Sequence, residues 1–240
     1  MSILITENKQ IVDTETGELL DRIEHRRKKF IWFNYNINEL LDNQFTKAEI
    51  FRIFYLATFI DYDNVLQFRN NKMTKNDMKE ILDLPKSTFY DFYNKLIQSD
   101  VLNETVEGYY EINDKYFYKG KVKKGWSPRI YCKTMQEAYQ NTELKDQTKW
   151  GYGFAIMPLV NLKYNIICNN PLEFDLNKIE PLEMYEIFDE IGINNLTNRE
   201  FLKGQNLVQQ SINGYYINPS IYLMGFEYDN QPPISDKKIR

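Results

Sequence analysis

The phrase Val106–Asn113 (VEGYYEIN) stands near the middle of the chain, and Ile212–Asn218 (INGYYIN) repeats it near the end. Both phrases run on to a glycine, which is Gly120 in the first copy and Gly225 in the second. Glu111 reads as an extra residue of the first copy. Repetition of this kind is typical of one structural unit that is used twice. The repeat therefore decides how the rest of the chain is divided.

The match extends upstream from both phrases. Residues 64–66 (NVL) answer residues 165–167 (NII), and Asn70-Asn71 answers Asn169-Asn170. Apolar residues also recur 109 positions apart, namely Met78, Leu82 and Leu84 against Ile187, Ile191 and Ile193. Between these positions and the tyrosines the second copy is three residues shorter. Several matches in the same order predict two related units.

The helical segments of the first copy follow from periodicity and capping signals. Residues 46–60 carry apolar side chains at the spacing of a packed helix. Thr74, with Asp77 three residues on, predicts the start of a helix that Pro85 ends. Ser87 then caps a further helix, whose apolar residues repeat at i, i+3, i+4 and i+7: Phe89, Phe92, Tyr93 and Leu96.

A β-hairpin follows these helices, with strands at 101–106 and 109–113 and a turn at Glu107-Gly108. With a short strand at 65–68, the order is that of a helix-turn-helix with a β wing. The sequence therefore predicts an α+β fold of two tandem winged helix-turn-helix modules. We expect an N-terminal hairpin and basic extension over 1–44, module 1 over 45–128, a linking helix (130–142) and module 2 over 129–226, and a tail over 227–240.

The N-terminal extension is expected to hold strands at 3–6 and 11–20, with a hairpin turn at Thr14–Gly17 that brings Val12 opposite Leu19.

Helix 87–98 is the candidate DNA-reading element, because a helix fits the major groove, where base edges are distinguishable. Cations before the module and after the wing are candidates for phosphate contacts. The predicted DNA-binding residues are Lys86, Ser87, Thr88, Tyr90, Asn94, Lys95, Gln98, Lys115, Lys119, Lys121, Lys123, Lys124, Arg129, Arg26, Arg27, Lys28 and Lys29. An amphipathic helix with a solvated polar face is the alternative interpretation.

The second copy carries fewer features of a DNA-reading unit. Its helix over 181–193 is acidic, and its counterpart of the reading helix, 194–206, is shorter. A possible second DNA contact is formed by Asn198, Arg199 and Lys203. We expect this module rather to dimerise the chain or to dock a protein partner, through apolar residues that exceed one core stripe: Met184, Ile187, Phe188, Ile191, Leu207, Val208, Tyr215 and Tyr216.

Charge separates the two copies. Residues 45–130 hold 14 basic and 12 acidic side chains, whereas residues 131–240 hold 10 and 14. The whole chain has a net charge of −4, which argues against a sequence-blind coat on nucleic acid. The middle module is thus the expected site of contact with double-stranded DNA.

Other classes of protein are poorly supported. No run of about 18 apolar residues and no signal segment appears, so no membrane association is expected. His25 is the single histidine, and phosphate-loop, nucleophile-elbow and metal patterns are missing. We expect no enzymatic activity, no cofactor and no metal. Cys132 and Cys168 predict two reduced, buried thiols in a bacterial cytoplasm.

Several phrases resemble DNA-binding proteins of low-GC Gram-positive phages and plasmids. Val12-Asp13-x-x-Thr16-Gly17-Glu18, Ile112-Asn113 and Tyr118-Lys119-Gly120 are similar to phrases of plasmid and phage replication proteins. Ile217-Asn218-Pro219 supplies the hydrophobic–Asn–Pro ending of such wings, where the first copy has Asp114 in place of proline. Residues 150–171 resemble phage- and plasmid-borne DNA-binding proteins of the same hosts.

Three functions remain open. The chain is expected to be a transcription regulator that binds an operator as a homodimer. The alternative is a replication initiator that binds origin repeats and a replication or transcription protein. The third is a phage protein that binds a host protein, which the net acidity favours.

Overall fold

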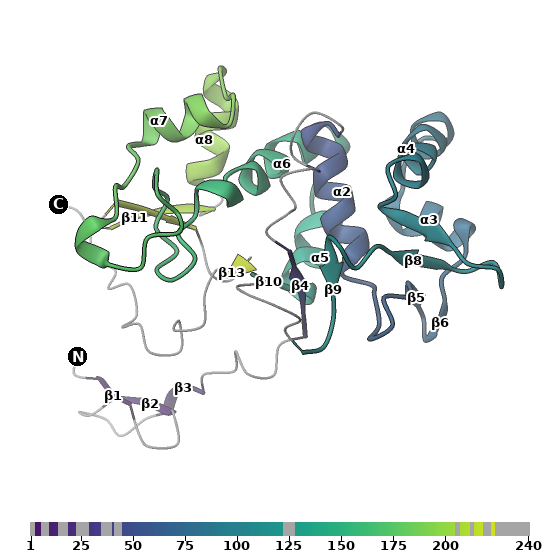
Figure 1. Cartoon of the computed structure of the whole chain (residues 1–240), viewed down its shortest axis with the longest axis horizontal. Coiled ribbons are helices and arrows are strands. Elements are labelled where there is room, and N and C mark those ends of the chain that lie inside the picture. Colours follow the sequence, from purple (N-terminus) through teal and green to yellow (C-terminus); the bar gives the residue numbers. More distant parts are fainter. Residues whose placement is uncertain are drawn as a thin grey trace.

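The computed structural model describes residues 3–5, 10–13, 19–22, 29–34, 40, 45–121, 128–204, 207–211, 214–217 and 222–223. It is an α+β structure of helices and small antiparallel sheets, as the sequence predicts (Figure 1). The first copy lies on the right of Figure 1 and the second on the left.

The first unit, residues 45–118, has a helix, a small hairpin, two further helices and a second hairpin. These elements are α2 (Lys47–Ala57), β5 (Gln67–Phe68), β6 (Asn71–Lys72), α3 (Lys75–Leu82), α4 (Lys86–Gln98), β7 (Leu102–Glu104), β8 (Tyr110–Ile112) and β9 (Phe117–Tyr118).

The second unit, residues 147–217, follows the same order of helices and hairpin. Its elements are α6 (Gln147–Ala155), η4 (Met157–Leu159), η5 (Leu176–Lys178), α7 (Met184–Glu190), α8 (Leu196–Gly204), β11 (Val208–Ser211) and β12 (Gly214–Ile217).

Between the units lie α5 (Cys132–Gln140) and η3 (Leu144–Asp146). A four-stranded sheet joins distant parts of the chain in the order β13 (Tyr222–Leu223), β10 (Arg129–Tyr131), β4 (Phe30–Phe33) and β9.

Equivalent hydrogen bonds relate the two units. The amide of Leu66 donates to the Tyr110 carbonyl, and the amide of Ile167 donates to the Tyr215 carbonyl, both at 2.8 Å. The preceding asparagines, Asn64 and Asn165, are both buried and both have a left-handed backbone, with φ of 62° and 59°. Such a backbone suits asparagine better than most residues. The internal repeat is therefore present in the hydrogen bonding as well as in the amino-acid sequence.

The helices α3 and α7 repeat the same capping. Thr74 with Asp77 and Glu183 with Glu186 each form a capping box, in which two backbone N–H groups at the helix start find partners. Each helix is followed by a left-handed residue, Asp83 with φ 45° or Gly192 with φ 75°. The chain therefore turns into α4 and α8 in the same way.

The hairpins correct the alignment of the repeated phrase. The carbonyls of Tyr110 and Tyr215 accept equivalent hydrogen bonds, so Tyr216 corresponds to Glu111, and isolated β-bridges pair Glu111 with Val65 and Tyr216 with Ile166. The extra residue of the first copy lies in the turn and not at Glu111. An alignment by residue identity is wrong here, because the register of the β-strands decides which positions of the two copies are equivalent.

The N-terminal strands are β1 (Ile3–Ile5), β2 (Gln10–Asp13) and β3 (Leu19–Arg22), which form a three-stranded antiparallel sheet. Val12 is paired with Leu19, as predicted, and the strand predicted at 3–6 appears as β1, which pairs with β2; the predicted turn at 14–17 lies outside the described residues. The predicted tail over 227–240 lies outside the described residues.

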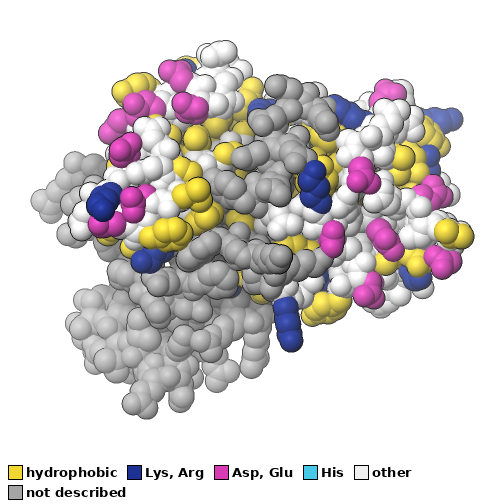
Figure 2. Space-filling model, in the orientation of Figure 1, with side chains coloured by type: hydrophobic (Ala, Val, Ile, Leu, Met, Phe, Trp, Pro, Cys, Tyr) yellow, Lys and Arg dark blue, Asp and Glu magenta, His cyan; other side chains and the backbone are white. Residues whose placement is uncertain are grey.

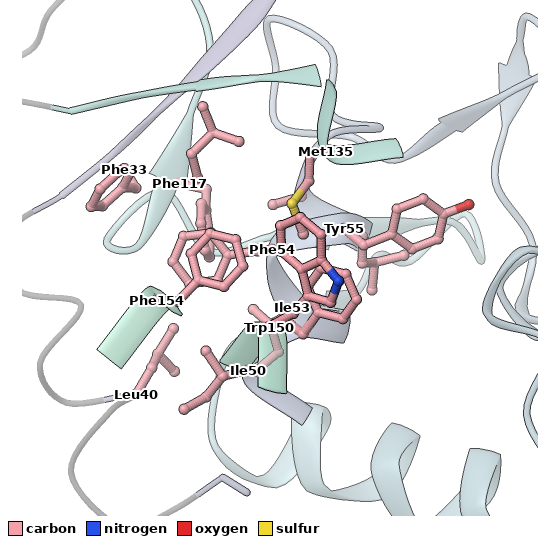
Figure 3. Close-up of a cluster of buried hydrophobic side chains, with 14 of the residues drawn as sticks. Phe33, Leu40, Ile50, Ile53, Phe54, Tyr55, Phe117, Met135, Trp150 and Phe154 are labelled. Carbon is pink, nitrogen blue, oxygen red and sulfur yellow. The ribbon is translucent and has the colours of Figure 1, made fainter. Parts of the chain in front are cut away.

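One core spans both units. Helix α2 is buried from Ile50 to Ala57 because it packs against both α5 and α6. The rings of Phe54 and Phe154 stack with centroids 4.3 Å apart, and those of Phe51 and Trp150 at 5.4 Å (Figure 3). The expected boundary at 128/129 therefore cuts through a shared core.

Gly151 allows the close approach of α6 to α2. A Cβ on this residue would lie 1.8 Å from the carbonyl oxygen of Lys47. Nearby, the buried Arg52 Nε donates to Gln147 Oε1 at 2.7 Å. Burial lowers the pKa of Arg52, while Tyr139 and Glu49 oppose this shift. The two units are thus joined by aromatic packing, a glycine contact and one buried polar bridge.

The predicted linking helix (130–142) appears as the shorter α5, because residues 129–131 form strand β10, and α5 packs against α2 of the first unit. Tyr139 stacks on Tyr55 with centroids 3.9 Å apart, and its hydroxyl donates to the Leu82 carbonyl at 2.9 Å. Burial raises the pKa of Tyr139 to about 12. Cys132 and Cys168 are free and buried, as predicted.

The expected association surface of the second unit is wrong in most of its members. Ile187, Phe188 and Ile191 are buried, as are Leu207 and Val208. These residues belong to the hydrophobic core, because α7 and β11 each turn apolar side chains into it. Of the residues expected on this surface, Met184, Tyr215 and Tyr216 are partly exposed. Most of the apolar residues that were expected to form an association surface therefore belong to the core.

Candidate nucleic-acid interface

Helix α4 separates a buried from an exposed face, as its periodicity predicts. Phe89, Phe92, Tyr93 and Leu96 are buried at 7% exposure or less. The helix begins at Lys86 with Pro85 at the N-cap, and no side chain caps it. The prediction that Ser87 caps the helix is therefore wrong, since Pro85 already fixes an extended entry to the helix, as proline commonly does near an N-terminus.

The exposed face of α4 is polar. Lys86, Ser87, Asn94 and Gln98 are exposed, Thr88 is half-buried, and Tyr90 is 39% exposed. Asp91 adds one carboxylate to the same face. These side chains have the donors and acceptors that can pair with base edges, and an amide such as that of Asn94 can pair bidentately with adenine.

Two lysines that the sequence analysis missed extend this face toward the hairpin. Lys75 Nζ, at the start of α3, lies 3.5 Å from the ring centroid of Tyr93 and 5.0 Å from that of Tyr90. Lys72 Nζ, on β6, lies 3.5 Å from the ring centroid of Tyr109 beside the turn. No linear signal marks these lysines, because they come from the small hairpin and helix that precede α4.

The tyrosines anchor this arrangement. The hydroxyl of Tyr93 lies 3.3 Å from that of Tyr110 on β8 and 3.4 Å from Glu104 on β7. Burial, together with Tyr110 and Glu104, raises the pKa of Tyr93, so its hydroxyl stays protonated at neutral pH. We call the exposed α4 residues with Lys72, Lys75 and Tyr109 the α4–hairpin face. Figure 2 shows basic and acidic side chains mixed over this right-hand end of the molecule.

Lys95, a predicted DNA contact, points to another element. Its amine lies 2.8 Å from Glu49 Oε2 on α2 and 4.8 Å from the ring centroid of Phe45. Burial alone would raise the pKa of Glu49, but the hydrogen bonds from Lys95 and Thr46 outweigh it, and the pKa is lowered. Lys95 therefore ties α4 to α2 in this structure.

The cations after the hairpin lie near the four-stranded sheet and not along α4. Lys119 Nζ donates to the Ile60 carbonyl at 3.1 Å, and the Arg129 guanidinium lies between the rings of Phe30 and Trp32 at about 5.5 Å. Lys29, Lys115 and Lys121 are exposed. Arg26, Arg27, Lys28, Lys123 and Lys124 lie outside the described residues, and their role stays a prediction.

The second unit directs its main cation inward. The Arg199 guanidinium donates to the Ile193 carbonyl at 3.2 and 3.3 Å and lies 5.0 Å from the ring centroid of Phe188. Asn195 Oδ1 accepts from the amide of Asn198 near the start of α8. The outer face of α8 exposes Leu196, at 69%, and Glu200. The side chain of Lys203 is outside the described part.

Within the described residues, no helix has the length and apolar character needed to cross a membrane. The same part of the chain holds no group of three or more His, Cys, Asp or Glu side chains arranged for a metal ion. Comparison of the chain with protein-family models, curated proteins and solved structures finds no match.

Proposed function

We propose that each unit is a winged helix-turn-helix and that the first unit binds double-stranded DNA with α4 in the major groove. The order α3, left-handed Asp83, Pro85, α4 and hairpin supports this proposal. In such an arrangement the second helix of the pair reads base edges while the hairpin lies along the backbone. The wing would here be the β7–β8 turn.

The α4–hairpin face is the observation that carries the proposal. It combines exposed amide and hydroxyl side chains on α4 with Lys72 and Lys75, whose ammonium groups lie beside tyrosines. Base edges would be read by Tyr90 and Asn94, and phosphates would be held by Lys72, Lys75 and Lys86. Among the described residues of the second unit, Arg199 donates to the Ile193 carbonyl and does not extend such a face.

We assign the chain to transcription regulators acting in the cytoplasm of a bacterial host. One reading helix covers only a few base pairs, so a homodimer on two half-sites would supply the affinity that an operator needs. Binding would then occlude or recruit RNA polymerase.

Replication initiation is the second candidate. The observation that favours it is the fusion of two like units through α2 and α6 into one core. Such a protein would bind origin repeats through its first unit, and its second unit would contact the other proteins of the initiation complex. Both candidates require the same DNA contact by α4.

Selection of bound sites from random duplex DNA by the full chain tests the proposal. We expect one enriched motif, followed by a footprint on the genome that carries the gene. A footprint over a promoter supports regulation, and a footprint over iterated repeats supports initiation. Failure to enrich any motif would overturn sequence-specific DNA binding.

A further inference from the structure

The second unit contains an insertion that the first unit lacks. Matching hydrogen bonds bound it, because Met73 N donates to Leu66 O and Leu182 N donates to Ile167 O. The first interval holds the tight β5–β6 hairpin, whereas the second is eight residues longer and forms a loop over residues 169–181. The loop is thus the largest difference between the two units.

Hydrogen bonds fix the shape of this loop. The buried Asn161 donates from Nδ2 to the carbonyls of Pro171 and Glu173 at 3.2 and 2.7 Å. Asn170 accepts from the amide of Glu180 at 2.9 Å and donates to the Lys178 carbonyl at 2.8 Å. Side-chain hydrogen bonds therefore hold the two ends of the loop, in addition to the β-bridge between Cys168 and Pro181.

The carboxylates of the loop bind its own backbone. Glu173 Oε1 accepts from the amides of Phe174 and Asp175, both at 2.8 Å, and Asp175 Oδ1 accepts from the amide of Asn177 at 3.1 Å. The Tyr164 hydroxyl donates to the Phe174 carbonyl at 3.2 Å. These bonds satisfy the backbone of the loop without covering its apolar side chains.

Three apolar side chains remain on the outside of this fixed loop. Leu172, Phe174 and Leu176 are 60%, 45% and 45% exposed. A single exposed leucine is ordinary, but three within five residues on a hydrogen-bonded loop form a patch of the kind that marks an interaction site. We call Leu172, Phe174 and Leu176 the loop strip.

Acidic side chains surround the loop strip. Glu173 and Asp175 alternate with its members, Glu180 and Glu183 follow it, and all but the half-buried Glu173 are exposed. Lys178 is the cation of the loop, with its amine 3.8 Å from Asp175 Oδ2. Figure 2 shows acidic and apolar side chains interspersed over this left-hand part of the molecule.

We infer that the loop strip is a docking site for a protein segment that presents apolar residues flanked by Lys or Arg. Apolar contact would bury Leu172, Phe174 and Leu176, and the basic flanks would meet the carboxylates of the loop. This surface is distinct from the α4–hairpin face and does not depend on DNA binding.

The charge decides between this occupant and others. Nucleic acid and anionic lipid are repelled by Glu173, Asp175 and Glu180. A second copy that met the loop strip about a two-fold axis would bring the same carboxylates face to face, which disfavours such pairing. A basic, apolar segment of another protein satisfies both parts of the surface.

Phage display of random 16-residue peptides tests the inference, with the full chain as bait. Counter-selection uses the full chain with Leu172→Ser, Phe174→Ser and Leu176→Ser. We expect enriched peptides that combine apolar residues with Lys or Arg and bind the unaltered chain at least about tenfold more tightly in fluorescence anisotropy. Raising the salt concentration should weaken this binding.

Controls separate the loop strip from the rest of the molecule. Tyr62→Ser removes another exposed aromatic side chain, 74% exposed in the first unit, and should leave peptide binding unchanged. Binding of the selected DNA should be the same in the triple variant and the unaltered chain. If circular dichroism shows that the triple variant has lost its fold, the single variant Phe174→Ser takes its place.

Three outcomes would overturn the inference. One is the absence of enriched peptides, and another is equal peptide binding by the unaltered chain and the loop variants. The third is concentration-dependent self-association that the loop variants abolish, because a second copy would then be the occupant.

Discussion

The two units share a frame and differ in what they present outside it. Both bury an asparagine with a left-handed backbone before a bridged strand, and both use a capping box on the following helix. Outside this frame, α4 has 13 residues and a polar face, whereas α8 has 9 and exposes Leu196. The first unit keeps a short hairpin where the second has the 169–181 loop.

This difference teaches that the buried positions carry the repeat and the exposed ones carry the specialisation. Burial, capping and left-handed turns constrain the frame in both copies, because an error there costs stability. Outer side chains are free of that constraint, so on our proposal one copy binds DNA and the other binds a protein. Substitutions in the shared frame or on one of the outer surfaces test this comparison.

The largest expected effect is on the joint between the units. Gly151→Ala places a Cβ against the Lys47 carbonyl, so α2 and α6 must separate. We expect the free energy of unfolding to fall by about 2 kcal/mol or more, although alanine itself favours the helix by about 1 kcal/mol. Chemical denaturation of the full chain measures this.

Gly153→Ala is the matched control on the same helix. Its Cβ would meet only the ends of flexible side chains, Leu207 at 3.2 Å and Leu202 at 3.8 Å, so the free energy of unfolding should change by less than about 1 kcal/mol. Equal effects of the two substitutions would show that the α2–α6 contact does not depend on Gly151.

A smaller effect concerns phosphate contacts. Lys72→Ala with Lys75→Ala should flatten the plot of log affinity against log salt by about two units for any duplex, because each lost phosphate contact removes about 0.9. Lys119→Ala with Arg129→Ala is the comparison, since these side chains bind Ile60 and two aromatic rings. A larger change from the second pair would move the DNA to the four-stranded sheet.

The smallest effect is a pH dependence of stability. The pKa of Glu49 is lowered in the folded state by Lys95 and Thr46, which outweigh burial. The stabilisation is therefore complete above the unfolded-state pKa of about 4.3 and is lost as the pH falls through the lower folded value. Glu49→Gln should reduce the free energy of unfolding at pH 7 and remove this part of the acid loss. Urea titrations at pH 7 and pH 3 provide the comparison, and an unchanged pH dependence would contradict it.

Much of the first unit could be predicted from the sequence because its signals are local. The spacing of Phe89, Phe92, Tyr93 and Leu96 gives the buried face of α4, and Thr74 with Asp77 gives the start of α3. The second unit misled the sequence analysis at Ile187, Phe188 and Ile191. An apolar residue counts as surface or core only once its partners are known, and these partners are distant in sequence.

The helix of the candidate site and its Lys86 were predicted, but its other two cations were not. Lys72 and Lys75 reach α4 through the fold, while Lys95 and Arg199 are turned toward Glu49 and Ile193. A lysine is long enough to serve either role, so its position on a helical wheel does not decide its partner. Gly151 likewise carried no signal, because its role depends on a helix about one hundred residues away.

The central claim is that α4 reads DNA and α8 does not. The most direct measurement is the affinity of the full chain for its selected duplex, compared between Asn94→Ala and Asn198→Ala. We predict that Asn94→Ala costs about 1–3 kcal/mol and relaxes the choice of base at one position, while Asn198→Ala leaves affinity and sequence choice unchanged. The reverse result would contradict the account, as would equal losses from the two variants.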